Sequence, residues 1–213
     1  MTPAPLAAVV VPVRSFPGGK SRLGGRLDGA GRADLLQAMA ERVVAAAGPL
    51  PVAIVSSARE VRAWAASLGL TLLGDPGSLD EAAACGMRWA RDLGALRVVV
   101  AHADLPLATT LAPLARDGSR PVVAAVPCHR DDGTPVLSLP TTAGPSGSGG
   151  FAFAYGPGSF RRHAAAARRA GFAFRVLRDG LLGRDVDAPE DLVGIHLPLP
   201  SGGRTSVADR ILV

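Results

Sequence analysis

The chain has 213 residues, and its hydrophobic fraction of 48% is sufficient for the core of one domain. A net charge of +5 would suit nucleic acid, but the arginines are scattered and only 4% of the residues are aromatic, so we expect an anionic small substrate and no nucleic acid. The apolar runs are too short and too often broken by proline to cross a bilayer, and no basic segment precedes the first one. We therefore expect no membrane partner and a cytoplasmic location, which the isolated Cys85 and Cys128 fit as reduced thiols.

Strand and helix patterns alternate along the chain, which predicts an α/β fold with a mostly parallel sheet and helices on both faces. The unbroken apolar run 97–101 is the expected centre of the sheet. Segment 134–139, which contains Pro135, is expected to be antiparallel or an edge strand. The expected strands are 7–13, 52–56, 70–73, 97–101, 121–126, 134–139 and 172–177, and the expected helices are 31–47, 59–68, 79–93, 158–170 and 188–195.

We expect one domain over residues 1–195, followed by a Pro- and Gly-rich, poorly ordered tail over 196–213. The Ser- and Gly-rich stretch 141–150 is the one low-complexity segment, and it is either a flexible connection or a loop over a site. The four arginines of the helix at 158–170 are expected to form a solvated face.

The loop between the first expected strand and the first expected helix carries a candidate phosphate site. Of the 23 basic residues, Lys20 is the only lysine, and it follows Gly18-Gly19 where open α/β proteins hold phosphates. A compact ammonium on a flexible stem suits a phosphate better than the rigid arginine fork does. The glycine spacing is not that of a Walker A loop, and the alternative interpretation is a solvated surface loop.

Three acidic residues at the ends of expected strands are candidate metal ligands. Asp104 follows the central strand, and Asp185 and Asp187 share one face of an extended segment, because residues i and i+2 point the same way. Carboxylate oxygens suit Mg²⁺ or Mn²⁺. The structural alternatives are an Asx turn at Asp104 and a helix N-cap at Asp187, with Glu190 completing a capping box.

A candidate anion site lies at the start of the arginine-rich helix. Gly156-Pro157-Gly158-Ser159-Phe160 offers backbone N–H groups and the Ser159 hydroxyl, and Thr134 offers a second hydroxyl to the same anion. The alternative is a turn in which Ser159 is only the N-cap of the helix.

Two other metal centres are alternatives. His102-Ala103-Asp104 begins a pattern for a two-His-one-carboxylate iron site, with His163 or His196 as the third ligand. Cys128-His129 with nearby aspartates would form a zinc site. The chain contains no nucleophile elbow.

Four stretches, taken together and in order, resemble a known family. They are Val11-Pro12-Val13-Arg14 with Lys20-Ser21-Arg22-Leu23, Ala103-Asp104-Leu105-Pro106-Leu107, Phe153-Ala154-Tyr155-Gly156-Pro157-Gly158-Ser159-Phe160, and Asp185-Val186-Asp187-Ala188-Pro189-Glu190-Asp191-Leu192. In these stretches the chain resembles the 2-phospho-L-lactate guanylyltransferase family, which includes the phosphoenolpyruvate guanylyltransferases of deazaflavin coenzyme F-420 biosynthesis. The resemblance covers nearly the whole chain, from Val9 to Leu192.

The resemblance implies a three-layer, Rossmann-like nucleotidyltransferase fold of the molybdenum-cofactor guanylyltransferase type. It also implies GTP as the donor and a small phosphorylated acid as the acceptor, namely 2-phospho-L-lactate, phosphoenolpyruvate or 3-phosphoglycerate. Both a monomer and a homodimer are left open. By the family's pattern, Asp104, Asp185 and Asp187 would hold Mg²⁺, and Thr134, Gly156 and Ser159 would hold the acceptor.

This sequence departs from the family's pattern near the expected base and acceptor pockets. Arg14 stands where lysine is usual, His102 where proline is usual, and Pro135 where asparagine is usual. Ser78-Leu79-Asp80 takes the place of Gly-Leu-Asn, which makes Asp80 a candidate substrate-binding residue. A divergent transferase that uses a different NTP, with another phosphate or a phosphonate as acceptor, therefore stays an alternative, as does a non-catalytic nucleotide-binding protein.

The expected reaction is in-line attack by the acceptor's phosphate oxygen on the α-phosphorus of GTP, which releases pyrophosphate. A phosphomonoester is largely dianionic at pH 7, because its second pKa is about 6, so this attack needs no general base. Lys20, Arg14 and Arg22 would neutralise the triphosphate, and one or two Mg²⁺ on the three aspartates would bind the α-phosphate and orient the attacking group.

Overall fold

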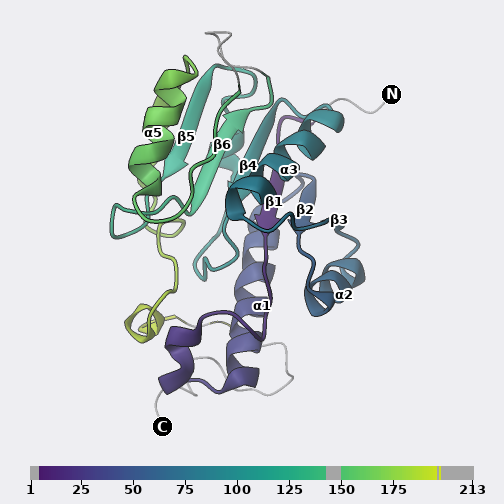
Figure 1. The fold of residues 1–213 in the computed structure, drawn as a ribbon, viewed down its shortest axis with the longest axis vertical. Helices are drawn as coiled ribbons and strands as arrows, with labels where there is room; N and C mark the ends of the chain where they lie inside the picture. Colours follow the sequence, from purple (N-terminus) through teal and green to yellow (C-terminus); the bar gives the residue numbers. More distant parts are fainter. Residues whose placement is uncertain (1–4, 143–149, 196, 198–213) are drawn as a thin grey trace.

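The computed structural model describes residues 5–142, 150–195 and 197, whose arrangement is shown in Figure 1. The predicted tail, apart from Leu197, and most of the Ser- and Gly-rich stretch lie outside the described residues. Among the residues that are described, no helix combines the length and the apolar character needed to cross a membrane.

Seven strands form a single mixed sheet in the order β3-β2-β1-β4-β6-β5-β7. The predicted central strand, β4, is at the centre, and every pairing is parallel except those of β6 with its two neighbours. β6 is therefore antiparallel, as expected, but it is an inner strand rather than an edge strand. Pro135, which suggested an edge position, lies one residue before the strand begins. The strands are β1 (Ala8–Pro12), β2 (Val52–Val55), β3 (Thr71–Leu73), β4 (Arg97–Ala101), β5 (Val122–Val126), β6 (Val136–Pro140) and β7 (Ala173–Val176).

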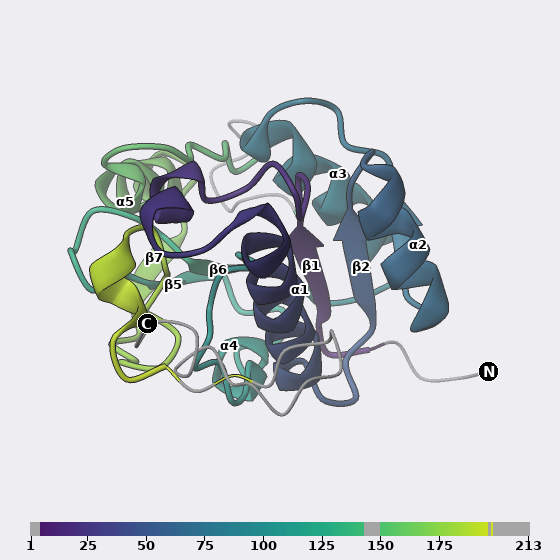
Figure 2. The same cartoon turned by 90° about the horizontal axis from the view of Figure 1, so that it is seen from below.

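Helices cover both faces of the sheet, as Figure 2 shows from below. The buried residues of α1, α2 and α4 pack on one face, and those of α3 and α5 pack on the other. The sequence did not predict the short α4 or η1, and the expected helix at 188–195 is only a short 3-10 turn, η2. The helices are η1 (Ser21–Gly25), α1 (Gly29–Ala46), α2 (Arg59–Ser67), α3 (Leu79–Asp92), α4 (Ala112–Ala115), α5 (Ser159–Arg169) and η2 (Pro189–Leu192).

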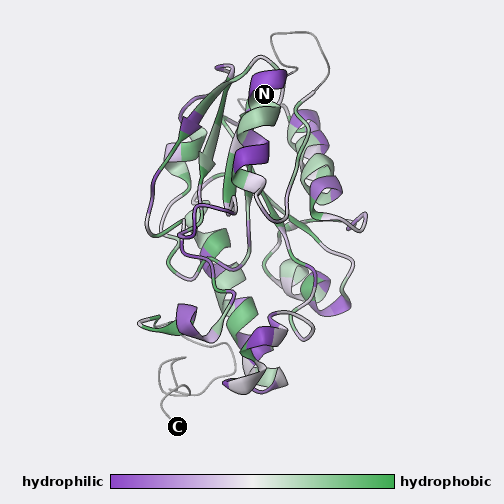
Figure 3. Cartoon of the chain, turned by 60° about the vertical axis from the view of Figure 1, so that its left-hand side comes forward, coloured by the Kyte–Doolittle hydropathy of each residue, from purple (hydrophilic) through white to green (hydrophobic). Residues whose placement is uncertain are grey.

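Alternation along the central strands divides the core into two layers. Val9 and Val11 of β1 belong to the cluster under α1, whereas Ala8 and Val10 belong to the cluster under α3. Figure 3 shows the strands mainly in hydrophobic colours, while the outer helices carry both hydrophobic and hydrophilic residues. The four arginines of α5 are exposed, as predicted for a solvated face.

The order of the strands fixes where a ligand would bind. The chain leaves β1 toward β2 on one side, and β4 lies on the other side of β1, so the topological switch point falls between β1 and β4. Open α/β sheets bind ligands at this point, beyond the carboxyl ends of the strands. The loop that contains Lys20 follows β1 and the segment that contains Asp104 follows β4, so both lie at that edge.

Candidate functional site

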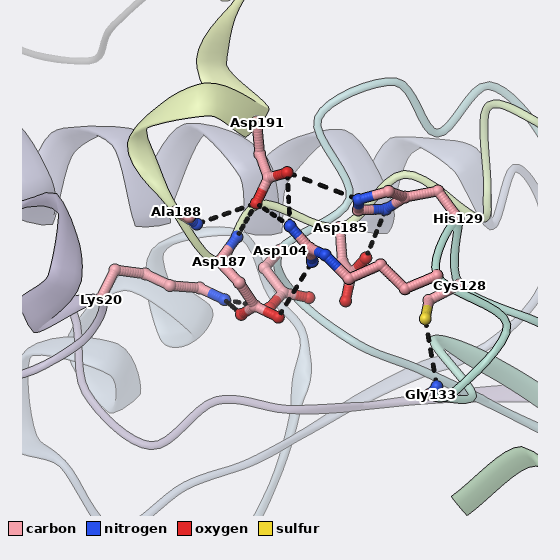
Figure 4. A network of polar contacts seen from close by, with 10 residues as sticks. Lys20, Asp104, Cys128, His129, Gly133, Asp185, Asp187, Ala188 and Asp191 are labelled. Atoms are coloured by element: carbon pink, nitrogen blue, oxygen red, sulfur yellow. Dashed lines mark hydrogen bonds and ion pairs between the residues drawn. The ribbon is translucent and has the colours of Figure 1, made fainter. Parts of the chain in front are cut away.

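Lys20 connects the two sides of the switch point. Its ammonium lies 2.5 Å from Oδ2 of Asp104 and 2.7 Å from Oδ1 of Asp187, as Figure 4 shows. The residue has a left-handed backbone conformation with φ of 52°, which is rare for a residue with a side chain.

The three predicted acidic residues converge. The backbone N–H of Val186 donates to the carbonyl oxygen of Asp104 over 3.2 Å, which attaches the segment 185–187 to the end of β4. Because Asp185 and Asp187 lie on either side of that attachment, both carboxylates flank Asp104 (Figure 4). The convergence that the sequence predicted from three separate positions is therefore present.

The capping role considered for Asp187 is wrong by one residue. Ala188 is the N-cap of η2, and Asp191 rather than Glu190 supplies the carboxylate at the third helical position. Oδ2 of Asp191 accepts the N–H groups of both Asp187 and Ala188 at 2.8 Å. The side chain of Asp187 is thereby left free to bind Lys20.

The pKa values of the residues in this cluster shift in different directions. Burial alone would lower the pKa of Lys20, but the charges of Asp104 and Asp187 outweigh it and hold that pKa above its ordinary value. Burial would raise the pKa of Asp104, but Lys20 and then His102 hold it below its ordinary value. Burial, with the charges of Asp104 and Asp187, raises the pKa of Asp185. Asp185 is therefore the carboxylate of the three whose charged form is disfavoured, although the charge of His129 partly offsets this effect.

Two pockets meet at Asp104. Pocket A has a volume of about 360 Å³ and is bounded by the Lys20 loop, the end of β1 and the start of α3. Pocket B has a volume of about 460 Å³ and is bounded by the loop 128–135, the start of α5 and the segment 185–187. Their shared lining residues are Leu79, His102 and Asp104. Two ligands held in the two pockets would therefore be adjacent at Asp104.

Several residues that line pocket B carry a buried polar atom without a hydrogen-bond partner. Among the described residues, six buried side-chain nitrogen or oxygen atoms lack a hydrogen bond. Four of the six belong to residues that line pocket B, namely His102 Nε2, Asp104 Oδ1, Tyr155 Oη and Asp185 Oδ1. Oδ1 of Asp185 is also 3.2 Å from Nδ1 of His129, without hydrogen-bond geometry. Buried polar atoms are normally paired, so this concentration indicates a pocket built for a polar ligand.

The cap at the start of α5 differs by one residue from the expected one. Its N-cap is Gly158 rather than Ser159, and the N–H groups of Gly158 and Phe160 donate to the side chain and backbone of Asp132. The N–H of Ser159 donates to the carbonyl oxygen of Gly156. These three N–H groups already have partners within the protein, and Ser159 and Thr134, which both carry hydroxyl groups, line pocket B.

Thr134 and Ser159 supply those hydroxyls. Both side chains line pocket B and both residues are almost fully buried, at 1% and 2% exposure. Their oxygens lie 3.3 Å apart, and Oγ1 of Thr134 is 3.0 Å from Nδ1 of His163. Gly156 also lines pocket B. The residues predicted for the acceptor therefore occupy one pocket together.

The three remaining predicted site residues, Arg14, Arg22 and Asp80, do not share one pocket. Arg14 is exposed, lines pocket A and donates to the carbonyl oxygen of Gly77 at 2.9 Å. Arg22 lines pocket B rather than pocket A. Asp80 lines neither pocket, and its carboxylate accepts the N–H of Tyr155 at 2.7 Å, which connects α3 to the segment that leads into α5.

Sequence reasoning missed Arg130 as a functional candidate. Arg130 lines pocket B, forms two hydrogen bonds with the carboxylate of Asp191 at 2.8 and 3.1 Å, and lies 4.0 Å from Asp187. Its position four residues after the end of β5 and beside the pair Asp131-Asp132 was the available signal. The pairing with Asp191 depends on tertiary structure.

The donor set suits a divalent cation, but the side chains are not grouped around one. Within the described part of the chain, no three His, Cys, Asp or Glu side chains are placed to hold a metal ion. The ammonium of Lys20 instead contacts both Asp104 and Asp187 (Figure 4). Oδ1 of Asp104 and Oδ1 of Asp185 lack a hydrogen-bond partner, and carboxylate oxygens are ligands that Mg²⁺ prefers, so the chemistry of the donor set fits this cation.

The alternative metal centres find less support. His163, considered as an iron ligand, already has both ring nitrogens within hydrogen-bond distance of Ala154 and Thr134. His196 lies outside the described residues. The thiol of Cys128, considered for zinc, accepts the N–H of Gly133 at 3.1 Å.

Comparisons with known proteins identify the family of the chain and agree with its fold. The family described as "Guanylyl transferase CofC like" matches residues 7–204. A phosphoenolpyruvate guanylyltransferase from Rubrobacter xylanophilus is 38% identical over 201 residues, which are 91% of this chain and 94% of that one. Another from Sphaerobacter thermophilus is 34% identical over 205 residues, which are 89% of this chain and 93% of that one.

A solved structure supports the fold. A nucleotide-diphospho-sugar transferase candidate from Desulfovibrio desulfuricans G20 superposes with a TM-score of 0.70 over 98% of this chain and 94% of that one. At 19% sequence identity, this similarity concerns the fold alone.

Proposed function

The chain is a nucleotidyltransferase that belongs to the Guanylyl transferase CofC like family, and we propose that it transfers a guanylyl group from GTP to phosphoenolpyruvate. The acceptor is the one for which the relatives from Rubrobacter and Sphaerobacter are named. The product would serve deazaflavin coenzyme F-420 biosynthesis, as the sequence resemblance implies. A cytoplasmic location stays a prediction, and the choice between a monomer and a homodimer stays open.

One observation carries the proposal: pockets A and B meet at Asp104, beside the ammonium of Lys20. A transferase that joins two substrates directly must place both reacting groups next to each other before reaction. We assign GTP to pocket A, which lies at the switch point, and the phosphorylated acid to pocket B, which is lined by Thr134, Ser159 and Arg130.

The reaction needs no proton transfer. A phosphate oxygen of the acceptor forms a bond to the α-phosphorus of GTP, and the bond from that phosphorus to the bridging oxygen breaks. The electron pair leaves with pyrophosphate. Because the attacking phosphate is already largely dianionic at pH 7, the barrier is mainly the approach of two anions.

The described residues supply positive charge on both sides of that approach. Lys20 and Arg14 face pocket A, and Arg22 and Arg130 face pocket B. When GTP enters, Lys20 would exchange its carboxylate partners for triphosphate oxygens. Asp104, Asp185 and Asp187 would then hold Mg²⁺ or Mn²⁺, which supplies charge neutralisation at the α-phosphate.

The deciding experiment incubates the protein with GTP, Mg²⁺ and phosphoenolpyruvate and measures pyrophosphate release and the mass of the adduct. Parallel reactions contain 2-phospho-L-lactate or 3-phosphoglycerate as the acceptor, or CTP, ATP or UTP as the donor. We expect the guanylyl adduct of phosphoenolpyruvate to predominate. Preference for another donor or acceptor would identify a divergent transferase of the same fold, and GTP binding without pyrophosphate release would identify a non-catalytic protein.

A further inference from the structure

Both ring nitrogens of the buried His163 have identified partners. Nε2 lies 3.0 Å from the backbone nitrogen of Ala154, and Nδ1 lies 3.0 Å from Oγ1 of Thr134. A backbone N–H can only donate, so Nε2 must be the bare nitrogen that accepts. A neutral ring then carries its single proton on Nδ1 and donates it to Thr134.

The ring is neutral under ordinary conditions. His163 is 0% exposed, and burial, with Arg162 and His102 nearby, lowers the pKa of His163 to about 4. A doubly protonated ring would also direct its Nε2 proton at the N–H of Ala154. The surroundings of His163 therefore select one of its two neutral tautomers.

This choice sets the direction of the hydrogen bonds beyond His163. Thr134 accepts from Nδ1, so it keeps its own hydroxyl proton. The contact between Thr134 and Ser159 uses one of their two hydroxyl protons, and the other remains available to pocket B. With the opposite tautomer, Thr134 would donate its only hydroxyl proton to Nδ1. Ser159 would then donate its own hydroxyl proton to Thr134, and neither proton would remain for pocket B.

We propose that His163 is a positioning residue that keeps the Thr134–Ser159 pair as a hydrogen-bond donor to an anionic oxygen of the acceptor in pocket B. His163 does not line the pocket, so it acts through Thr134. This inference rests on the proposed function for the identity of the ligand. The orientation of the hydroxyl pair is a property of the protein alone.

The first test therefore needs no turnover. In protein labelled with ¹⁵N-histidine, NMR distinguishes protonated from bare ring nitrogens, and His163→Gln and His163→Asn identify the signals of His163 among the four histidines. We expect a protonated Nδ1 and a bare Nε2 at pH 7. A proton on Nε2 at pH 7, in either a neutral or a charged ring, would overturn the inference.

The second test is a double-mutant cycle read by steady-state kinetics. A hydrogen bond to a charged group is worth roughly tenfold to a hundredfold, so Thr134→Val should lower kcat/KM for phosphoenolpyruvate by about that factor and leave the KM for GTP unchanged. His163→Gln keeps an acceptor near Ala154 but offers Thr134 no donor, so it should cause a similar loss. The double variant should be no worse than Thr134→Val.

His163→Asn is the matched variant, because its amide can place an N–H near the position of Nδ1. It should therefore recover much of the activity that His163→Gln loses. Independent losses that multiply in the double variant, or an equal rise in the KM for GTP, would mean that His163 acts only on packing. If the wild-type protein forms no adduct with any acceptor, the proposed function fails, and the NMR result still decides the tautomer.

Discussion

Nζ of Lys20 lies 2.5 Å from Oδ2 of Asp104, although 84 residues separate the two positions in the sequence. The contact joins the loop after β1 to the segment after β4, across the switch point of the sheet. It places the only lysine of the chain at the boundary between the two pockets. The contact therefore identifies the part of the molecule where substitutions should affect turnover most.

Replacing Lys20 should lower turnover strongly. Removal of one group that stabilises transition-state charge typically costs about 10²–10³ in rate, and we expect Lys20→Ala to lower kcat by that factor. Lys20→Arg should recover only part of the loss, because the planar fork does not reproduce a compact ammonium. Arg26→Ala removes one charge from an exposed residue nearby and should retain full activity. Near wild-type kcat in Lys20→Ala would exclude the assigned role.

Asp104→Asn should impair both catalysis and cation binding. We expect kcat to fall by at least about 10², because Asp104 is the carboxylate that faces both pockets. Mn²⁺ binding, followed by electron paramagnetic resonance with and without GTP, should weaken in the same variant. Asp92→Asn, an exposed position on α3, is the control. Unchanged Mn²⁺ affinity in Asp104→Asn would remove this residue from the metal site.

Arg130→Ala should affect the acceptor more than the nucleotide. Arg130 lines pocket B and not pocket A, so the KM for phosphoenolpyruvate should rise by about tenfold, the value of a typical charge-assisted hydrogen bond, while the KM for GTP stays constant. Arg178→Ala removes a solvent-exposed ion pair with Asp131 on the same loop and should change neither constant. A larger effect on GTP than on the acceptor would reverse the assignment of the pockets.

His163 should make the stability of the fold depend on pH. Its pKa falls from 6.5 in the unfolded chain to about 4 in the folded protein, so the unfolded state binds more protons between these values. The free energy of unfolding should be fully retained above about pH 6.5 and should decrease by up to about 3 kcal/mol as the pH falls to 4. Urea titrations at several pH values give the free energy of unfolding of wild type and of His163→Gln. The dependence of this free energy on pH should be steeper for wild type between pH 4 and 6.5, and an equal dependence in the two proteins would contradict the prediction.

Gly86 allows α3 to approach β1 closely. A Cβ atom at Gly86 would lie 2.3 Å from one methyl group of Val10, so Gly86→Ala should destabilise the protein by about 1–3 kcal/mol through overpacking. Val10→Ala should also destabilise it, by leaving a cavity. The double variant should lose less than the sum of the two, because the new methyl group fills the space that Val10 vacates. Additive losses in thermal or chemical unfolding would show that the two positions are not in contact.

The sequence alone determined the alternating elements and the chemical types at the site. Apolar runs and glycine or proline boundaries placed the seven strands and the longer helices, because burial on a sheet requires those patterns. The single lysine and the acids at strand ends were also visible, since local position identifies where a parallel sheet exposes its carboxyl edge. The resemblance in four short stretches added the class of reaction.

Tertiary structure alone decided which side chains face one another. The insertion of β6 between β4 and β5, the pairing of Arg130 with Asp191 and the tautomer of His163 all depend on contacts between distant segments. The capping of η2 was misread by one residue, because Glu190 and Asp191 are both chemically suitable as the capping carboxylate and only the folded backbone selects Asp191. Residue type limits what each group can do, whereas burial and distance, which arise only on folding, determine which of those possibilities is realised.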